Sequence, residues 1–259
     1  MNPPRHLLVF RFSALGDIAM TVPVIRLVLQ QHPHLQITYV SAPFAAPLFA
    51  DIERLHFFAA DFKKQYKGVN GLYQLHKHLL TNIHFDAIAD LHNVLRTKLL
   101  RLFFALSPKK MAVLDKGRAG KKELTRVRNK RLHPLPTMFE RYASVFNSFD
   151  LAVDLNQALP ALNLVVPDSL QAVKLEGYRL VGVAPFAKHA EKTYPLPRMM
   201  EVVKLLAAAP RVKVFLFGGK EEAITLDSWA GQLQEVTSLA GKMDFAEELA
   251  HIQSLDVMV

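Results

Sequence analysis

The chain has 259 residues, of which 51% are hydrophobic and 21% charged, and it carries a formal net charge of +9 and no cysteine. This composition is typical of a globular protein and excludes an intrinsically disordered chain. Arg11 and Asp17 interrupt the N-terminal apolar run, so we expect neither a signal peptide nor a membrane span and predict a cytoplasmic protein. The lack of cysteine excludes disulfides, thiolate zinc sites and cysteine nucleophiles, and no metal or cofactor is expected.

The first element is an apolar strand over residues 6–12, followed by the turn Ser13-Ala-Leu-Gly-Asp17 and an apolar helix over residues 17–31. Gly16 supplies the backbone freedom that a tight turn requires. Ligands of open α/β sheets bind outside the carboxyl ends of the strands, so Asp17 is expected to face a crevice. Two interpretations stay open: a general base kept ionised by the helix dipole, or an N-cap that satisfies backbone N–H groups.

Strand-like and helical segments then alternate along the first half. Predicted strands cover 36–40, 55–59, 87–91 and 110–114, and predicted helices cover 43–50, 68–83, 94–105 and 136–149. Such alternation is typical of parallel β-α-β units with helices on both faces of the sheet. Residues 150–174 lack a clear period and contain Pro160 and Pro167, which indicates a connection between two domains.

The alternation restarts in the second half. Predicted strands cover 180–184, 212–217, 235–239 and 255–259, and predicted helices cover 198–208, 220–233 and 244–253. We therefore predict an α/β protein with two doubly wound domains, residues 1–165 and residues 166–259. The last predicted strand has no following turn or helix, so we expect the second domain to be truncated in this chain.

Residues 116–131 hold most of the net charge. They contain eight Lys or Arg residues and one Glu, which gives +7 and leaves only +2 for the rest of the chain. Such a run can bind the phosphates of nucleic acid, lipid head groups or a phosphorylated sugar, or it can be a solvated loop. Gly117 and Gly120 favour a mobile loop, and the lack of aromatic residues disfavours nucleic acid. A phosphate-rich small or lipid-linked partner fits better.

Several common catalytic motifs are missing from the sequence. The first turn is not Gly-x-Gly-x-x-Gly, and there is no phosphate-binding P-loop, no Gly-x-Ser-x-Gly and no His-Glu-x-x-His. Their absence disfavours dinucleotide oxidoreductases, P-loop kinases, α/β-hydrolases and zincins. The sequence also lacks an Asp-x-Asp pair, so we expect any nucleotide-sugar chemistry to be metal-independent.

An ordered series of motifs runs along most of the chain. Ser13-Ala-Leu-Gly-Asp17 followed by Thr21-Val-Pro23 resembles the opening of the heptosyltransferases, glycosyltransferase family nine. Further matches follow in family order: residues 85–97, 138–142, Gly182-Val-Ala-Pro185, Lys192-Thr-Tyr-Pro195, 216–222 and 239–243. Tyr194 stands where the family more often has Trp. The family's later Asp-Thr/Ser-Gly-x-x-His element is absent from these 259 residues, so we expect this chain to bind donor poorly.

The resemblance implies a GT-B fold, in which two Rossmann-like domains face a cleft. It also implies inversion of the anomeric centre, with Asp17 as base and Lys192 as the cation near the departing phosphate. Further donor-binding residues implied by the family are Thr193, Gly218, Gly219, Glu221, Glu222 and Met243. The acceptor side is implied at Ser13, Gly16, Arg96, Lys116, Arg118, Lys121 and Lys122.

We therefore predict a metal-independent glycosyltransferase that moves a heptose or related sugar from an ADP-sugar-type donor. The acceptor is predicted to be a lipopolysaccharide core or another cell-surface glycan, an anionic glycolipid that implies peripheral contact with the inner membrane and no nucleic-acid partner. The alternative is a non-catalytic module that binds anionic lipid or nucleic acid through residues 116–131. A nucleotide-sugar epimerase would share the donor, but it would leave that basic segment unexplained.

Overall fold

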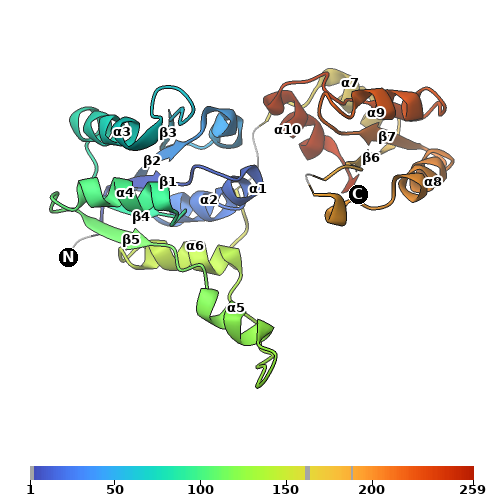
Figure 1. Cartoon of the computed structure of the whole chain (residues 1–259). Coiled ribbons are helices and arrows are strands. Elements are labelled where there is room, and N and C mark those ends of the chain that lie inside the picture. Colours follow the sequence, from blue (N-terminus) through green and yellow to red (C-terminus); the bar gives the residue numbers. More distant parts are fainter. Residues whose placement is uncertain (1–2, 161–163, 188) are drawn as a thin grey trace. The chain divides into compact units, whose positions relative to one another are not determined.

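The computed structural model describes residues 3–160, 164–187 and 189–259. The chain divides into two compact units, Met1–Leu162 and Asn163–Val259. Each unit holds one parallel sheet flanked by helices (Figure 1). Within the described ranges, no helix is long and apolar enough to cross a membrane.

The N-terminal unit is built on a five-stranded parallel sheet with the order β3-β2-β1-β4-β5. The strands are β1 (His6–Phe10), β2 (Gln36–Ser41), β3 (Leu55–Ala59), β4 (Ala87–Asp90) and β5 (Lys110–Val113). Side chains of the central strand β1 alternate between two cores, with Leu7 and Val9 in one and Leu8 and Phe10 in the other. Helices therefore cover both faces, as is usual for parallel sheets.

Two groups of helices cover this sheet. One core contains residues of α1 (Leu15–Ala19), α2 (Val22–Gln31), the 3-10 helix η1 (Pro43–Phe49) and α6 (Met138–Asn147). The other contains residues of α3 (Gly68–Asn82) and α4 (Leu95–Phe104). Helix α5 (Arg118–Thr125) buries no residue and extends away from the layers (Figure 1).

The structure corrects three local expectations in the N-terminal unit. The predicted helix over 17–31 is two helices, because the chain turns at Thr21, whose hydroxyl donates to the Ile18 carbonyl at 2.7 Å. Asp17 is not an N-cap, since Ala14 holds that position. The predicted mobile loop over 116–131 contains helix α5, which begins after Gly117 in the left-handed conformation.

The C-terminal unit has a four-stranded parallel sheet with the order β8-β7-β6-β9. Its strands are β6 (Arg179–Val183), β7 (Val212–Leu216), β8 (Val236–Ser238) and β9 (Val257–Met258). Its helices are α7 (Asp168–Leu175), η2 (Ala190–Lys192), α8 (Leu196–Ala207), α9 (Ala223–Ala230) and α10 (Phe245–Ser254). Helix α7 lies in the stretch 150–174 that we predicted to be an irregular connection, and Leu170 anchors it in a core with Leu180 of β6.

Both sheets share one topological feature. The strand order moves outward from β1 to β3 and then returns to place β4 beside β1, and the second sheet repeats this with β6 and β9. Ligands of open α/β sheets bind outside the carboxyl ends of the strands at such a reversal. Arg11 directly follows β1 and His92 lies two residues beyond β4, so both belong to the edge where a ligand is expected.

Candidate active site

Asp17 is paired with a buried arginine at the carboxyl end of β1. The Arg11 Nη2 atom lies 2.5 Å from Oδ2 of Asp17, and its Nη1 donates to the Leu91 carbonyl at 2.7 Å. The Arg11 side chain is 6% exposed, whereas that of Asp17 is 45% exposed. In the described part of the structure, Oδ1 of Asp17 has no hydrogen bond or ion pair. One carboxylate oxygen is thus held while the other faces outward.

A buried aspartate fixes the neighbouring turn. Asp90 ends β4 and is fully buried, and its Oδ1 accepts from the backbone N–H groups of His92 at 2.9 Å and Asn93 at 2.8 Å. Its Oδ2 lies 3.2 Å from Nε of Arg101 on α4. Arg11 donates to the carbonyl of Leu91 in the same turn. Asp90 therefore fixes the position of the backbone that binds Arg11.

The groups around Asp17 form a cationic environment. Burial, together with the charges of Arg11, Lys116 and Arg96, lowers the pKa of His92 to about 4. Nδ1 of His92 accepts from the Phe12 N–H at 3.4 Å, so the ring is neutral at neutral pH. Burial also lowers the pKa of Lys116, with Arg11 contributing. These fields favour an anion near Asp17.

The predicted acceptor residues fall into two groups. Ser13 and Gly16 are exposed beside Asp17, and Lys116 and Arg96 lie within electrostatic reach of His92. The Arg96 guanidinium stands 4.8 Å from the centre of the Phe62 ring. The remaining residues, Arg118, Lys121 and Lys122, are exposed on α5, and only Arg118 affects the electrostatics of Lys116.

The base of the basic segment is held by an arginine of α6. Gly117 has a φ of 61°, and a Cβ there would overlap the Arg141 guanidinium. Arg141 is 9% exposed and donates from Nε to the Pro136 carbonyl at 3.1 Å and from Nη1 to the Asp115 carbonyl at 3.3 Å. One side chain thus ties together both ends of the segment between Asp115 and Pro136.

The predicted donor residues Gly218, Gly219 and Glu222 lie together after β7. The Glu222 carboxylate accepts a hydrogen bond from the Gly219 N–H. The Gly241 N–H donates to the Gly218 carbonyl at 3.0 Å, which joins this turn to the turn after β8. Gly241 has a φ of 65° and approaches the Lys220 backbone closely. Met243, two residues on, is half-buried against the core that contains Phe215 and Leu239.

Three predicted donor residues are solvent-accessible. Lys192 ends η2 and is exposed, Thr193 is half-buried, and Glu221 is exposed. Among the described residues, neither Lys192 nor Glu221 has a side-chain hydrogen bond or ion pair. Both are free to meet a ligand, whereas Glu222 already holds a backbone turn.

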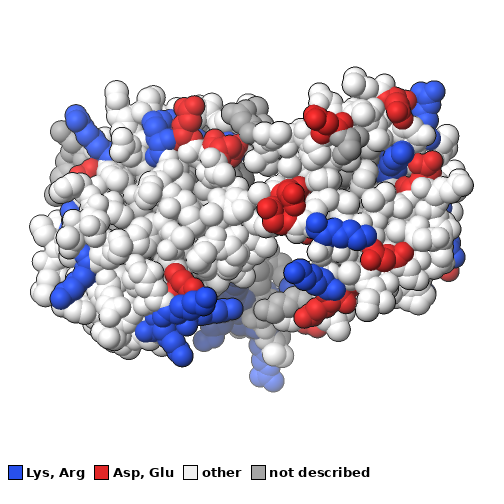
Figure 2. Space-filling view, turned by 90° about the horizontal axis from the view of Figure 1, so that it is seen from above, with Lys and Arg blue, Asp and Glu red and all other residues white. Residues whose placement is uncertain are grey.

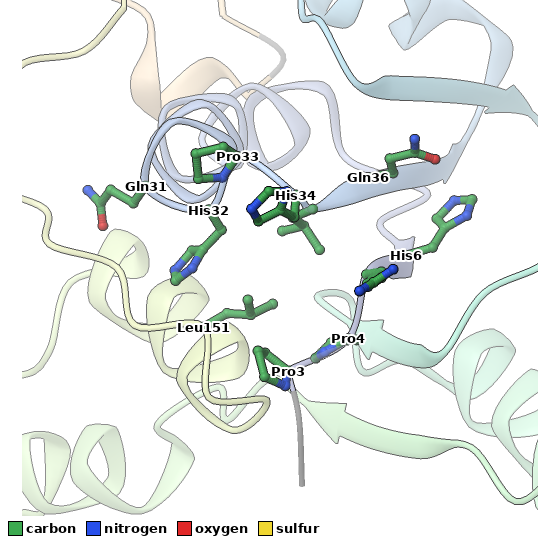
Figure 3. A pocket seen from close by; sticks show the side chains of 11 residues that line it. Pro3, Pro4, His6, Gln31, His32, Pro33, His34, Gln36 and Leu151 are labelled. Atoms are coloured by element: carbon green, nitrogen blue, oxygen red, sulfur yellow. The ribbon is translucent and has the colours of Figure 1, made fainter.

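A separate hollow of about 710 Å³ lies at the opposite edge of the N-terminal sheet. Its lining comes from the start of β1, the end of α2 and the start of β2 (Figure 3). Among its lining residues are Arg5, His6, His32 and His34, and none was predicted for the active site. The carboxylate and cations described above are therefore at the other ends of the same strands.

Sequence reasoning missed Arg11, Asp90 and His92 as members of this cluster. A signal was present for two of them, since Arg11 and Asp90 are charged residues at the ends of apolar strands. The contacts that join the two strand ends, Arg11 to the Leu91 carbonyl and the Phe12 N–H to His92, each span 80 positions along the chain. Only the pairing of β1 with β4 brings them together.

The fold is that of GT-B proteins of known structure. It superposes on the glycosyl transferase family 9 structure from Veillonella parvula DSM 2008 with a TM-score of 0.76 and 18% identity, covering 100% of this chain and 76% of that one. For E. coli heptosyltransferase WaaC with ADP, the TM-score is 0.68 at 14% identity, with 98% and 80% covered. For E. coli ADP-heptose lps heptosyltransferase II, the TM-score is 0.67 at 16% identity, with 98% of this chain and 78% of that one covered. The predicted class, GT-B with Rossmann-like domains, is confirmed.

The sequence identifies the family within that class. The model of glycosyltransferase family 9 (heptosyltransferase) matches residues 73–259, and the chain belongs to this family. It is also 26% identical over 99 residues to the lipopolysaccharide core heptosyltransferase OpsX of Haemophilus influenzae. That alignment spans 38% of this chain and 27% of the relative.

Proposed function

We propose that this protein transfers a heptose or related sugar from an ADP-sugar-type donor to an anionic glycolipid acceptor of the lipopolysaccharide core. The observation that carries the proposal is the Asp17–Arg11 pair, which presents one free carboxylate oxygen at the carboxyl edge of the sheet. Family membership supports a glycosyltransferase. The solved complexes of WaaC with ADP and with ADP-2-deoxy-2-fluoro heptose support an ADP-sugar donor.

The proposed reaction is a single inverting displacement. The acceptor hydroxyl gives its proton to Oδ1 of Asp17 as its oxygen attacks the anomeric carbon of the donor. The bond between that carbon and the diphosphate breaks, and the nucleoside diphosphate leaves with the electron pair. Arg11 orients the Asp17 carboxylate through the ion pair to Oδ2. Lys192 is assigned to the charge that gathers on the departing phosphate.

We propose that the transfer needs neither a metal nor another cofactor. The sequence contains no Asp-x-Asp pair, the usual carboxylate clamp for a metal-bound nucleotide diphosphate. Lys192 would then carry the stabilisation of the leaving group, because the Gly219 N–H already donates to the Glu222 carboxylate. We place the reaction in the cytoplasm, where a nucleotide-sugar donor is made.

The test compares Asp17→Asn with Glu53→Gln, a change of an exposed carboxylate elsewhere in the same unit. The protein is assayed with ADP-heptose and a lipid-linked core acceptor, with and without EDTA. Asp17→Asn should lower kcat by about 10²–10⁴-fold, the usual contribution of a general base, and leave acceptor affinity intact. Glu53→Gln and EDTA should leave kcat unchanged.

Undiminished turnover of Asp17→Asn would refute the base assignment, and loss of activity in EDTA would refute metal independence. The rival binding module is tested by changing Lys121, Lys122, Arg126 and Arg128 together to Gln. An enzyme should lose mainly acceptor affinity, seen as a higher acceptor KM. A pure binding module should show no transfer before the change and no binding after it.

A further inference from the structure

Helix α5 presents a cationic side to solvent and an apolar side to the chain that returns beneath it. Arg118, Lys121 and Lys122 are exposed and recur at helical spacing on one side. On the other side, Leu124 is half-buried and a Cβ at Gly120 would contact the Leu135 side chain at 2.6 Å. The returning segment therefore covers the back of the helix and leaves its cations facing outward.

The coil after α5 mixes cations with apolar side chains that nothing covers. Val127 is 100% exposed and Leu132 is 81% exposed. Arg126, Arg128, Lys130 and Arg131 flank them, and all four are exposed. Single exposed apolar residues are common, but here Val127 stands within the run of charge +7 and Leu132 directly follows it. Cations interleaved with exposed apolar side chains are typical of segments that lie in a membrane interface.

The projection formed by residues 118–132 is presented on a fixed base. Arg141 joins Asp115 to Pro136 below it, and α5 and its coil extend away from the sheet layers (Figure 1). On the face seen from above, several Lys and Arg side chains lie close together (Figure 2). A projecting cationic surface can reach a flat partner without hindrance from the rest of its unit.

We propose that this projection docks the protein on an anionic lipid bilayer, with the Lys and Arg side chains on the head groups and Val127 and Leu132 in the interfacial layer. Lys and Arg near an anionic surface each strengthen binding, and apolar side chains add attachment that a soluble anion cannot supply. Nucleic acid fits less well, because residues 116–132 contain no aromatic side chain for base stacking. The inference does not rest on the transfer reaction, since docking requires neither donor nor acceptor.

The experiment is flotation of the protein with vesicles of phosphatidylglycerol and phosphatidylethanolamine, compared with vesicles of phosphatidylcholine, in the absence of donor and acceptor. We expect binding to the anionic vesicles alone, weakened by salt. Lys121→Gln/Lys122→Gln should weaken it on the order of 10-fold. The matched control is Lys63→Gln/Lys64→Gln, which removes two exposed lysines of the same unit and should bind as the unchanged protein does.

A second pair of variants separates a membrane from a soluble anion. Val127→Ser/Leu132→Ser keeps every charge and should still weaken vesicle binding several-fold, whereas Val69→Ser/Leu102→Ser, at 60% and 65% exposure in the same unit, should not. All changed residues are exposed, and thermal unfolding confirms that each variant folds.

Four results would overturn the proposal. Equal binding to both kinds of vesicle would show that anionic lipid is not recognised. Unchanged binding of Val127→Ser/Leu132→Ser, or full release by millimolar inorganic phosphate, would assign the cations to a soluble anion. Tighter binding to single-stranded RNA than to anionic vesicles would assign them to nucleic acid. Each result leaves the transfer assay of Asp17→Asn to be judged by itself.

Discussion

The carboxyl edges of the two sheets are held by different kinds of interaction. In the N-terminal unit, charged side chains hold one another, as Arg11 holds Asp17 and Arg101 pairs with Asp90. In the C-terminal unit, hydrogen bonds from backbone N–H groups hold the turns. The Gly241 N–H donates to the Gly218 carbonyl, and the Gly219 N–H donates to the Glu222 carboxylate. Fixed charge suits a proton transfer, whose group must be oriented before reaction. Backbone turns suit a phosphate-bearing ligand, which N–H groups can approach closely.

The largest expected effect comes from removing the cation that holds Asp17. Arg11→Met should lower kcat by about 10²-fold, a loss similar to that of a single oriented donor, with little change in donor KM. Arg11→Lys should restore part of kcat, because it returns the charge without the hydrogen bond to Leu91. Steady-state kinetics of the three proteins checks this, with circular dichroism to confirm folding.

A merely structural role for Arg11 would be indicated if Lys gave no rescue, or if kcat and donor KM changed in parallel with the folded fraction. In that case the ion pair between Arg11 and Asp17 would have no role in catalysis. The comparison between charge-held and backbone-held edges would then fail for function, although it would stand for structure.

Lys192 offers the corresponding test in the C-terminal unit. It is exposed and lacks a partner among the described residues, so Lys192→Gln should preserve folding and lower kcat about 10-fold or more by weakening stabilisation of the leaving phosphate. Lys204→Gln, an exposed lysine of α8, is the control and should leave kcat unchanged. Equal kinetics for the two variants would remove Lys192 from the reaction.

The local sequence predicted the elements whose apolar pattern is continuous and missed features that depend on distant partners. The strands around β1 and β4 and the place of Asp17 after the first strand follow from runs such as Leu7–Phe10, which is buried throughout. The Arg11–Leu91 contact does not, because it requires β1 and β4 to pair across 80 positions. Helix α7 was missed because its short amphipathic pattern is flanked by irregular chain, and its burial depends on β6.

Gly117 in the basic segment is a second position whose structure depends on a distant partner that the local sequence does not reveal. Gly117 indicated mobility from sequence, but its positive φ begins α5, and Arg141, 24 residues later along the chain, closes over it. Gly117→Ala should therefore lower the free energy of unfolding by about 1–3 kcal/mol, since a left-handed non-glycine residue is strained and its Cβ displaces Arg141.

The matched variant is Gly16→Ala, where an added Cβ meets nothing within 4 Å. It lies inside α1, so it should be neutral or slightly stabilising, because Ala favours helix over Gly. Urea unfolding of both variants gives the two values. Equal stability would contradict the clamp at Gly117, while a raised acceptor KM for Gly16→Ala alone would support the predicted acceptor contact at that position.

The smallest effect concerns how the charged edge responds to pH. Burial and nearby cations lower the pKa of His92 to about 4 from 6.5. The unfolded chain therefore binds a proton at this residue between these two values, while the folded protein does not. The unfolded state is favoured as pH falls through that window, and the contribution of His92 to stability is complete above about pH 6.5.

When the pH falls from about 7 to about 4.5, the free energy of unfolding of both the unchanged protein and the His92→Gln variant should fall. For His92→Gln the fall should be smaller than for the unchanged protein by about 2 kcal/mol. His133→Gln, which alters an exposed histidine, should follow the unchanged protein, so the difference between the two variants isolates the buried ring. Identical pH dependence of all three would mean that His92 is accessible to protons. Water would then reach the carboxyl edge of the sheet around Asp17, which would contradict the burial of Arg11 and of the turn after β4.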